Sequence, residues 1–241
     1  MNSLLSFVLP HWTAPSNVRS AVTIRRGGNS QDPYAELNLA THVGDDEQSV
    51  ADNRQLLCDE LQLQREPYWL DQVHGSRVVE AESELLPRAD GIVTSQPGHP
   101  IAILVADCLP ILMCDKQGTC IGAVHAGWKG LADGVIGSMV DKLGSDRQLI
   151  AWLGPAIGPC HYEVGSDVIE AFEDGAGLSV TQVEESHWKM DLWETATHQL
   201  QQLGVHEIHG GGICTHCHER DFFSYRRDGV TGRNAALIWL T

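Results

Sequence analysis

The sequence has few basic residues for its size: 16 Lys and Arg stand against 32 Asp and Glu, and the formal net charge is −16. Nucleic acids and anionic membrane surfaces attract basic proteins, so this balance argues against general binding to either. An acidic surface mainly keeps a protein soluble. An anionic substrate would need a local basic pocket.

The sequence also lacks a long apolar run, and no stretch approaches the length of a membrane-spanning helix. The first residues, MNSLLSFVLPHW, have neither the basic start nor the small-residue cleavage site of a secretory signal. Seven cysteines are present, an odd number without a secretory signal. We therefore expect a reduced, cytoplasmic chain.

No internal repeat, low-complexity segment or linker divides residues 1–241, so we expect a single domain. Apolar runs and turn signals predict strands at 17–24, 68–70, 77–80, 91–94, 101–105, 111–114, 119–125, 149–153, 222–225 and 235–240. Helices are expected at 45–64, 131–143, 166–173 and 190–203. Because strands and helices mix without a strict βαβ alternation, the expected fold class is α/β, in the mixed α+β sense.

Three residues stand at the ends of short apolar runs: His74 in DQVHGSRVV, Cys108 in IAILVADCLP and His125 in IGAVHAGWKG. Functional side chains collect at strand ends in α/β proteins. Two imidazoles and a thiolate are good ligands for zinc or copper, and three ligands leave a position open for water or substrate. Three such ligands would form a catalytic metal site, but residue types alone favour the simpler interpretation of two ordinary histidines and a buried cysteine.

Cys108 and His125 also support a second interpretation. A thiolate paired with an imidazole is a nucleophile for acyl or amide chemistry and needs no metal. The sequence does not separate a metal-bound thiolate from a nucleophilic one. Asp107, beside Cys108, either shuttles protons, orients a ligand or caps a turn.

The segment Cys214–His218 (CTHCH) contains one C-x-x-C, which without a partner pair is weak evidence for structural zinc. It also holds the one clear H-x-H of the chain, whereas a blue multicopper oxidase needs several. The zinc signature of nucleobase deaminases, H-x-E with P-C-x-x-C, is absent and is only echoed by Pro159-Cys160-His161.

Several segments together are more specific than the three residues. In order, they are RRGGNSQDPYAELNLATHVGDD, DQVHGSRVV, ADGIV, ADCLPILMCD, GAVHAGWKG, GPAIGPCHYEVG and FFSYRRDGVTGRNAALI. From about Ser20 to the C-terminus the chain closely resembles the laccase-domain family, whose members are named polyphenol oxidases, purine nucleoside phosphorylases or peptidoglycan editing factors. Asp32 and Ala40 depart from the family pattern, since each stands where Gly is commoner.

The resemblance implies a compact mixed α/β domain similar to bacterial toxin deamidases and cysteine hydrolases, with His74, Cys108 and His125 as the catalytic metal centre. It implies a purine nucleoside and phosphate as substrates: phosphorolysis of adenosine, inosine and methylthioadenosine, with deamination of adenosine. Zinc is the expected ion, and copper is the alternative. The alternative activities are hydrolysis of a cell-wall precursor amide bond and copper-dependent oxidation of phenols. The sequence does not fix the preferred nucleoside, the metal loaded or the oligomeric state.

Phosphorolysis needs an anion site near the ribose. The Gly-containing loop at 25–30 and the GWKG turn are candidates, because glycine permits close backbone approach and helix N-termini favour anions. Arg25 is expected to contact phosphate, and Asn38 and His42 are expected to contact the nucleoside. A polar turn with a surface arginine, a turn-stabilising Asn and an ordinary surface His are the alternatives.

Overall fold

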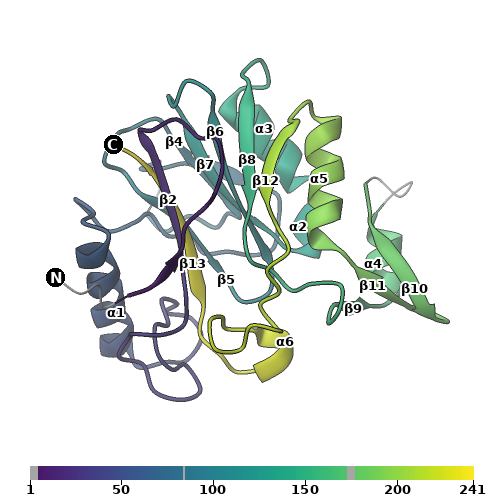
Figure 1. Cartoon of the computed structure of the whole chain (residues 1–241), viewed down its shortest axis with the longest axis horizontal. Helices are drawn as coiled ribbons and strands as arrows, with labels where there is room; N and C mark the ends of the chain where they lie inside the picture. Colours follow the sequence, from purple (N-terminus) through teal and green to yellow (C-terminus); the bar gives the residue numbers. More distant parts are fainter. Residues whose placement is uncertain (1–4, 84, 173–176) are drawn as a thin grey trace.

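Two β-sheets packed face to face form the centre of the molecule, which a computed structural model describes over residues 5–83, 85–172 and 177–241 (Figure 1). The smaller of these two sheets has the strand order β1 (Phe7–Val8), β2 (Val18–Thr23), β13 (Asn234–Leu240) and β5 (Ile101–Val105). The larger has the order β12 (Glu207–Gly210), β8 (Leu149–Leu153), β6 (Leu109–Asp115), β7 (Ile121–Ala126), β4 (Gly91–Thr94) and β3 (Val78–Glu80). The pairs β3–β4 and β8–β12 are parallel, and the other described pairs in these sheets are antiparallel.

The smaller sheet contributes to two hydrophobic cores, one on each of its faces, because its side chains alternate along the strands. Ala236 and Ile238 of β13 pack between the sheets with Ile121 of β7 and other apolar residues. Ala235 and Leu237 point to the opposite face of the smaller sheet. Because successive strand residues face opposite ways, a strand buried on both faces is apolar throughout.

Helices cover both outer faces, giving a mixed α/β single compact domain in four layers. Helix α1 (Glu47–Glu60) begins at Asp46, whose carboxylate accepts a hydrogen bond from the backbone N–H of Ser49, and it buries Leu57 against the smaller sheet. Helices α2 (Trp128–Ala132), α3 (Val135–Leu143) and α5 (Leu192–Gln202) cover the larger sheet. Figure 1 shows α1 and these three helices on opposite sides of the sheets.

A third, three-stranded sheet extends beyond the main body next to α4 (Ser166–Ala171) (Figure 1). Its strand order is β10 (Val180–Glu184), β11 (His187–Met190) and β9 (Glu163–Val164). The sequence prediction missed these strands, as well as β1 and β12. Strand β10 is VTQVE, with polar residues between its two valines, and it is largely exposed, so it lacks the apolar run by which the other strands were recognised.

The predicted strands at 68–70 and 222–225 are wrong. Tyr68 forms only an isolated bridge to Ile101. Phe222 and Phe223 are buried, but helix α6 (Tyr225–Asp228) follows at once, capped by Ser224. The predicted helix 131–143 is divided between α2 and α3, and position 173 of the predicted helix 166–173 lies outside the described residues.

Within the described part of the chain, no helix combines the length and the apolar character that crossing a membrane requires.

Candidate metal centre and substrate cavity

The structure brings His74, Cys108 and His125 together. Their ligand atoms, one from each side chain, all lie within 4.8 Å of one another. The two imidazole rings meet edge to face, with centroids 4.7 Å apart. Two nitrogens and a sulfur at this spacing are a donor set that fits zinc or copper with a coordination position left open.

The topology of the two sheets explains the convergence. Strand β5 belongs to the smaller sheet and β6 to the larger, so the connection that carries Cys108 crosses from one sheet to the other. His125 lies near the end of β7 and follows Ile121 and Ala123 on the face between the sheets. Asp107 and His74 have left-handed backbones, with φ of 94° and 62°, which turn the chain sharply beside the site.

A buried carboxylate, Asp90, holds both histidines. Its Oδ1 lies 2.8 Å from His125 Nδ1, and it accepts hydrogen bonds from the backbone N–H groups of His74 and Gly75 at 2.9 and 2.7 Å. The backbone N–H of His125 also donates a hydrogen bond to the backbone carbonyl oxygen of Asp90 at 2.7 Å. Because Asp90 accepts at Nδ1, the His125 Nε2 is the ring nitrogen available to a metal.

Gly127 leaves room for the centre at the start of α2. A Cβ atom at this position would lie 3.0 Å from the Cys108 sulfur and 3.4 Å from Cδ2 of His74. The distance to the sulfur is shorter than an ordinary van der Waals contact and the distance to His74 is at its lower limit, so a side chain here would displace Cys108. The glycine in GAVHAGWKG therefore has a steric role beside the centre.

The charges of Cys108 and His125 depend on each other. Burial favours the neutral thiol, but attraction to His125 and hydrogen bonds from His125 and His74 prevail and lower the pKa of Cys108 to about 6. Burial likewise disfavours a charged imidazole, yet the Cys108 thiolate and the hydrogen bond to Asp90 raise the pKa of His125 to about 9. The thiolate form that a metal or a nucleophilic mechanism requires is thus favoured.

The three residues open into a cavity of about 500 Å³. The groups that line it include aromatic rings and two arginines, and they come from segments far apart in the sequence: His42, Gln72, His74, Leu104, Val105, Ala106, Asp107, Cys108, His125, Trp128, Ile157, Tyr162, Leu192, Tyr225, Arg226 and Arg233. A cavity of this size, part apolar and with a few convergent polar groups, suits a small-molecule ligand.

Of the predicted substrate residues, the structure places His42 in this cavity but not Arg25 or Asn38. Arg25 donates to the backbone carbonyl oxygens of Ala35 and Glu219, and its guanidinium stacks over the Phe223 ring. Arg25 is thus engaged outside the cavity, and its predicted phosphate contact has no support in this geometry.

The Asn38 side chain is fully buried, and most of its hydrogen bonds are to backbone groups. Its amide donates to the Ala40 carbonyl and to Asp45, and its oxygen accepts from the N–H groups of Ala40 and Arg233. It therefore stabilises its own turn and fixes Arg233, which does line the cavity.

Asp107 holds together segments that form the cavity wall. Its carboxylate accepts from the Thr215 hydroxyl at 2.6 Å and from the backbone N–H of Arg226 at 2.7 Å. Both oxygens are therefore occupied by structural partners, which favours the orienting interpretation of Asp107 over proton transfer.

Comparison with known proteins places the chain in a family. Residues 19–241 match the family model described as multi-copper polyphenol oxidoreductase laccase. The chain belongs to this family. It is 45% identical to a purine nucleoside phosphorylase of Pseudomonas aeruginosa over 240 residues, which cover 98% of each chain. It is 40% identical to the purine nucleoside phosphorylase YfiH of Escherichia coli, with 97% of this chain and 98% of the relative covered.

Solved structures similar to this chain share its fold. A Neisseria meningitidis protein, NMB0706, superposes with a TM-score of 0.91 at 40% identity, covering 97% of this chain and 98% of that one. YlmD from Geobacillus stearothermophilus superposes with a TM-score of 0.87 at 30% identity, and 99% of each chain is covered.

Sequence analysis missed three residues of this laccase-family site. Asp90 and Arg233 lie inside the quoted motifs ADGIV and TGRNAALI, and Tyr162 lies inside GPCHYEVG, but none had a predicted role. The signal for Asp90 was an acidic residue at the start of an otherwise buried strand, a position where a carboxylate needs a partner.

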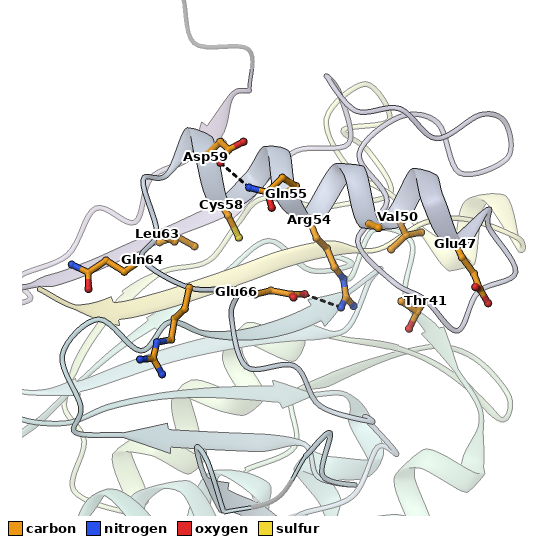
Figure 2. Close-up of a pocket in the computed structure, with 12 residues that line it drawn as sticks. Thr41, Glu47, Val50, Arg54, Gln55, Cys58, Asp59, Leu63, Gln64 and Glu66 are labelled. Atoms are coloured by element: carbon orange, nitrogen blue, oxygen red, sulfur yellow. Dashed lines mark hydrogen bonds and ion pairs between the residues drawn. The ribbon is translucent and has the colours of Figure 1, made fainter.

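A second cavity, of about 450 Å³, lies beside α1 (Figure 2). Figure 2 shows two pairs among its polar groups, Arg54 with Glu66 and Gln55 with Asp59. The paired atoms lie 3.1 and 2.8 Å apart. Burial raises the pKa of Cys58 to about 11, so its thiol stays neutral. This second cavity therefore offers no activated thiol, unlike the cavity of His74, Cys108 and His125.

Proposed function

We propose that the protein is a metal-dependent purine nucleoside phosphorylase that also deaminates adenosine. The observation that carries this proposal is the near full-length similarity, at 40–45% identity, to proteins named purine nucleoside phosphorylases. A cavity that joins the candidate metal centre to two arginines supports it.

The arginines supply the basic pocket that an anionic substrate needs in an acidic protein. Arg233 uses Nη1 to bind the carbonyl oxygens of Thr231 and Gly232, and Arg226 uses Nη1 to bind the Glu163 carbonyl. Among the described residues, the Nη2 group of each has no hydrogen-bond partner. Guanidinium donors held in this way match phosphate oxygens in charge and geometry.

A nucleoside fits the remaining surface. Tyr225 and Trp128 line the cavity and offer ring faces for a purine. Burial, followed by repulsion from Arg233, lowers the pKa of His42, so its imidazole is neutral near pH 7 and can hydrogen-bond a ribose hydroxyl. In phosphorolysis a phosphate oxygen bonds to ribose C1′, the bond from C1′ to the purine nitrogen breaks, and the purine leaves with that electron pair and takes up a proton.

The proposed metal ligands are His74, Cys108 and His125. When bound there, zinc or copper supplies Lewis-acid chemistry at the open coordination position. Asp90 holds the His125 tautomer, and Gly127 leaves the space in which the three ligands meet. In the companion deamination, water adds at C6 of adenine and ammonia leaves, which gives inosine.

The lowered pKa of Cys108 favours a second candidate function. A thiolate beside an imidazolium can attack an amide carbonyl, form an acyl-enzyme and release an amine. In that case Cys108 is the nucleophile rather than a metal ligand.

Product analysis tests the proposal. The zinc-loaded protein is incubated with adenosine with and without phosphate, and adenine, inosine, hypoxanthine and ribose 1-phosphate are separated. We expect adenine and ribose 1-phosphate only when phosphate is present, and inosine in both reactions. If the protein forms neither ribose 1-phosphate nor inosine, the proposal that it acts on nucleosides is wrong, and amide hydrolysis becomes the leading candidate function.

A further inference from the structure

Four metal-ligating side chains gather outside the substrate cavity. Cys160 and His161 lie on the turn before β9, and Cys214 and Cys217 lie on the turn that follows β12. Their ligand atoms all lie within 4.8 Å of one another, and none of the four residues lines the cavity. The sequence offered a C-x-x-C without a partner pair, and the fold supplies the two missing ligands.

Four of the distances between ligand atoms in this cluster are close to those of a tetrahedral zinc site. The Cys160 sulfur lies 3.8 Å from that of Cys214 and 3.7 Å from that of Cys217. Nδ1 of His161 lies 3.3 Å from the Cys160 sulfur and 3.4 Å from the Cys217 sulfur. Zinc–sulfur bonds of about 2.3 Å and zinc–nitrogen bonds of about 2.0 Å place tetrahedral ligands about 3.5–3.8 Å apart. A disulfide would need the sulfurs about 2.05 Å apart.

Groups around the cluster support these ligands. The backbone N–H of Gly158 donates to the Cys214 sulfur at 3.2 Å, an interaction that stabilises a thiolate. The His216 ring stacks on the His161 ring, with centroids 3.9 Å apart and an interplanar angle of 11°, which fixes its orientation. Three cysteines and one histidine form a closed ligand set, as in structural zinc sites, in contrast to the open set of His74, Cys108 and His125.

We infer that Cys160, His161, Cys214 and Cys217 bind a second, structural zinc ion. This inference is independent of the proposed activity, because none of the four residues has a role in it.

The second zinc would join two segments that both hold Asp107. The N–H of Ile157 donates to the Asp107 carbonyl at 2.8 Å, and the Thr215 hydroxyl donates to its carboxylate at 2.6 Å. A bridge between Ala156 and Cys214 already aligns these segments. Zinc bound to Cys160, His161, Cys214 and Cys217 would hold these two segments together just beyond the bridge, and so would stabilise the cavity wall at Asp107, beside Cys108.

Metal stoichiometry tests this inference. Wild-type protein, Cys108→Ala and Cys217→Ser are loaded with zinc, freed of loosely bound ions by gel filtration and analysed for metal by mass spectrometry. We expect two zinc ions per wild-type chain, one in each variant and none in the double variant. Cys58→Ser is the matched control, since it removes a thiol from α1 outside both groups and should keep two.

Two further measurements distinguish a zinc–thiolate site from a disulfide. Replacing zinc with cobalt in Cys108→Ala should give strong sulfur-to-cobalt charge transfer, because three thiolates remain at one site. All six remaining thiols should titrate in the denatured, metal-free variant. A metal-free Cys108→Ala protein after zinc loading, or two missing thiols that mark a disulfide, would overturn the inference.

Discussion

The carboxylate of Asp90 lies 2.8 Å from Nδ1 of His125, and both groups are almost completely buried. The same carboxylate accepts from the backbone N–H of His74, so one residue orients two of the three proposed metal ligands. A carboxylate hydrogen-bonded to the other ring nitrogen of a metal-ligating histidine sets the tautomer and the basicity of that histidine.

We expect Asp90→Asn to weaken zinc binding at this centre by about 10–100-fold, because the amide cannot supply the negative charge that holds His125 Nδ1–H. Competition with a zinc chelator measures the change. Asp115→Asn is the control: Asp115 is another buried carboxylate, and it binds Thr119, Cys120 and Arg147 away from the centre. It should lower the melting temperature and leave zinc affinity at the centre unchanged. Equal zinc affinities in the two variants would show that Asp90 has no special role.

Gly127→Ala should reduce zinc affinity at the centre by about tenfold or more, since the added methyl group lies 3.0 Å from the Cys108 sulfur and displaces it. The same chelator competition measures this. Gly137→Ala is the matched control, because a Cβ at that position of α3 would meet no heavy atom within 4 Å beyond its chain neighbours and the backbone of its own helix. It should keep full zinc affinity and stabilise the helix by about 0.5–1 kcal/mol. A Gly127→Ala protein with unaltered zinc affinity would contradict the steric role.

In metal-free protein, Cys108 should react with iodoacetamide at pH values where ordinary thiols are inert. Only the thiolate reacts, and the pKa of Cys108 is lowered to about 6. The alkylation rate should therefore be half-maximal near pH 6 and fall about tenfold per pH unit below it. Peptide mass spectrometry gives the rate at each cysteine. Cys114, whose pKa burial raises to about 12, should remain unmodified up to pH 9. A midpoint for Cys108 near 8 or above would contradict the thiolate–imidazolium pair.

Arg233→Ala should raise the phosphate concentration needed for half-maximal phosphorolysis by about 10–100-fold, the equivalent of losing charged hydrogen bonds of about 1.5–3 kcal/mol. Deamination uses water instead of phosphate and should change much less. Arg25→Ala is the comparison, because Arg25 is engaged outside the cavity and should leave the phosphate requirement unchanged. If Arg25→Ala has the larger effect on phosphate, the phosphate site lies elsewhere.

The sequence predicted the mixed fold class and most strands of the two main sheets, because those strands are apolar runs buried on both faces. It failed for β10, which is largely exposed, and for β11, in which one of four residues is buried, so neither strand is an apolar run. It also failed at 222–225, where aromatic residues belong to the core without forming a strand.

For the site, residue type and position at strand ends made His74, Cys108 and His125 candidates, and the resemblance of the surrounding motifs to a family made them the predicted centre. The partners of this centre come from distant segments, and their roles depend on which way a side chain points. Arg25 and Arg233 are both arginines beside glycine-containing turns, and only the packing of the two sheets decides that Arg233 reaches the cavity. Cys160 meets Cys214 because the segments that follow the paired strands β8 and β12 stay side by side, joined by the bridge between Ala156 and Cys214.

The central claim is that phosphorolysis takes place at the centre formed by His74, Cys108 and His125. The most direct test measures ribose 1-phosphate and inosine formed from adenosine by zinc-loaded wild-type protein, His125→Ala and Cys108→Ser, with thermal unfolding as a check that each variant folds. We predict that both products fall by at least about a hundredfold in both folded variants, about 2.7 kcal/mol of transition-state stabilisation. Ribose 1-phosphate formation that persists at the wild-type rate in either variant would contradict the claim.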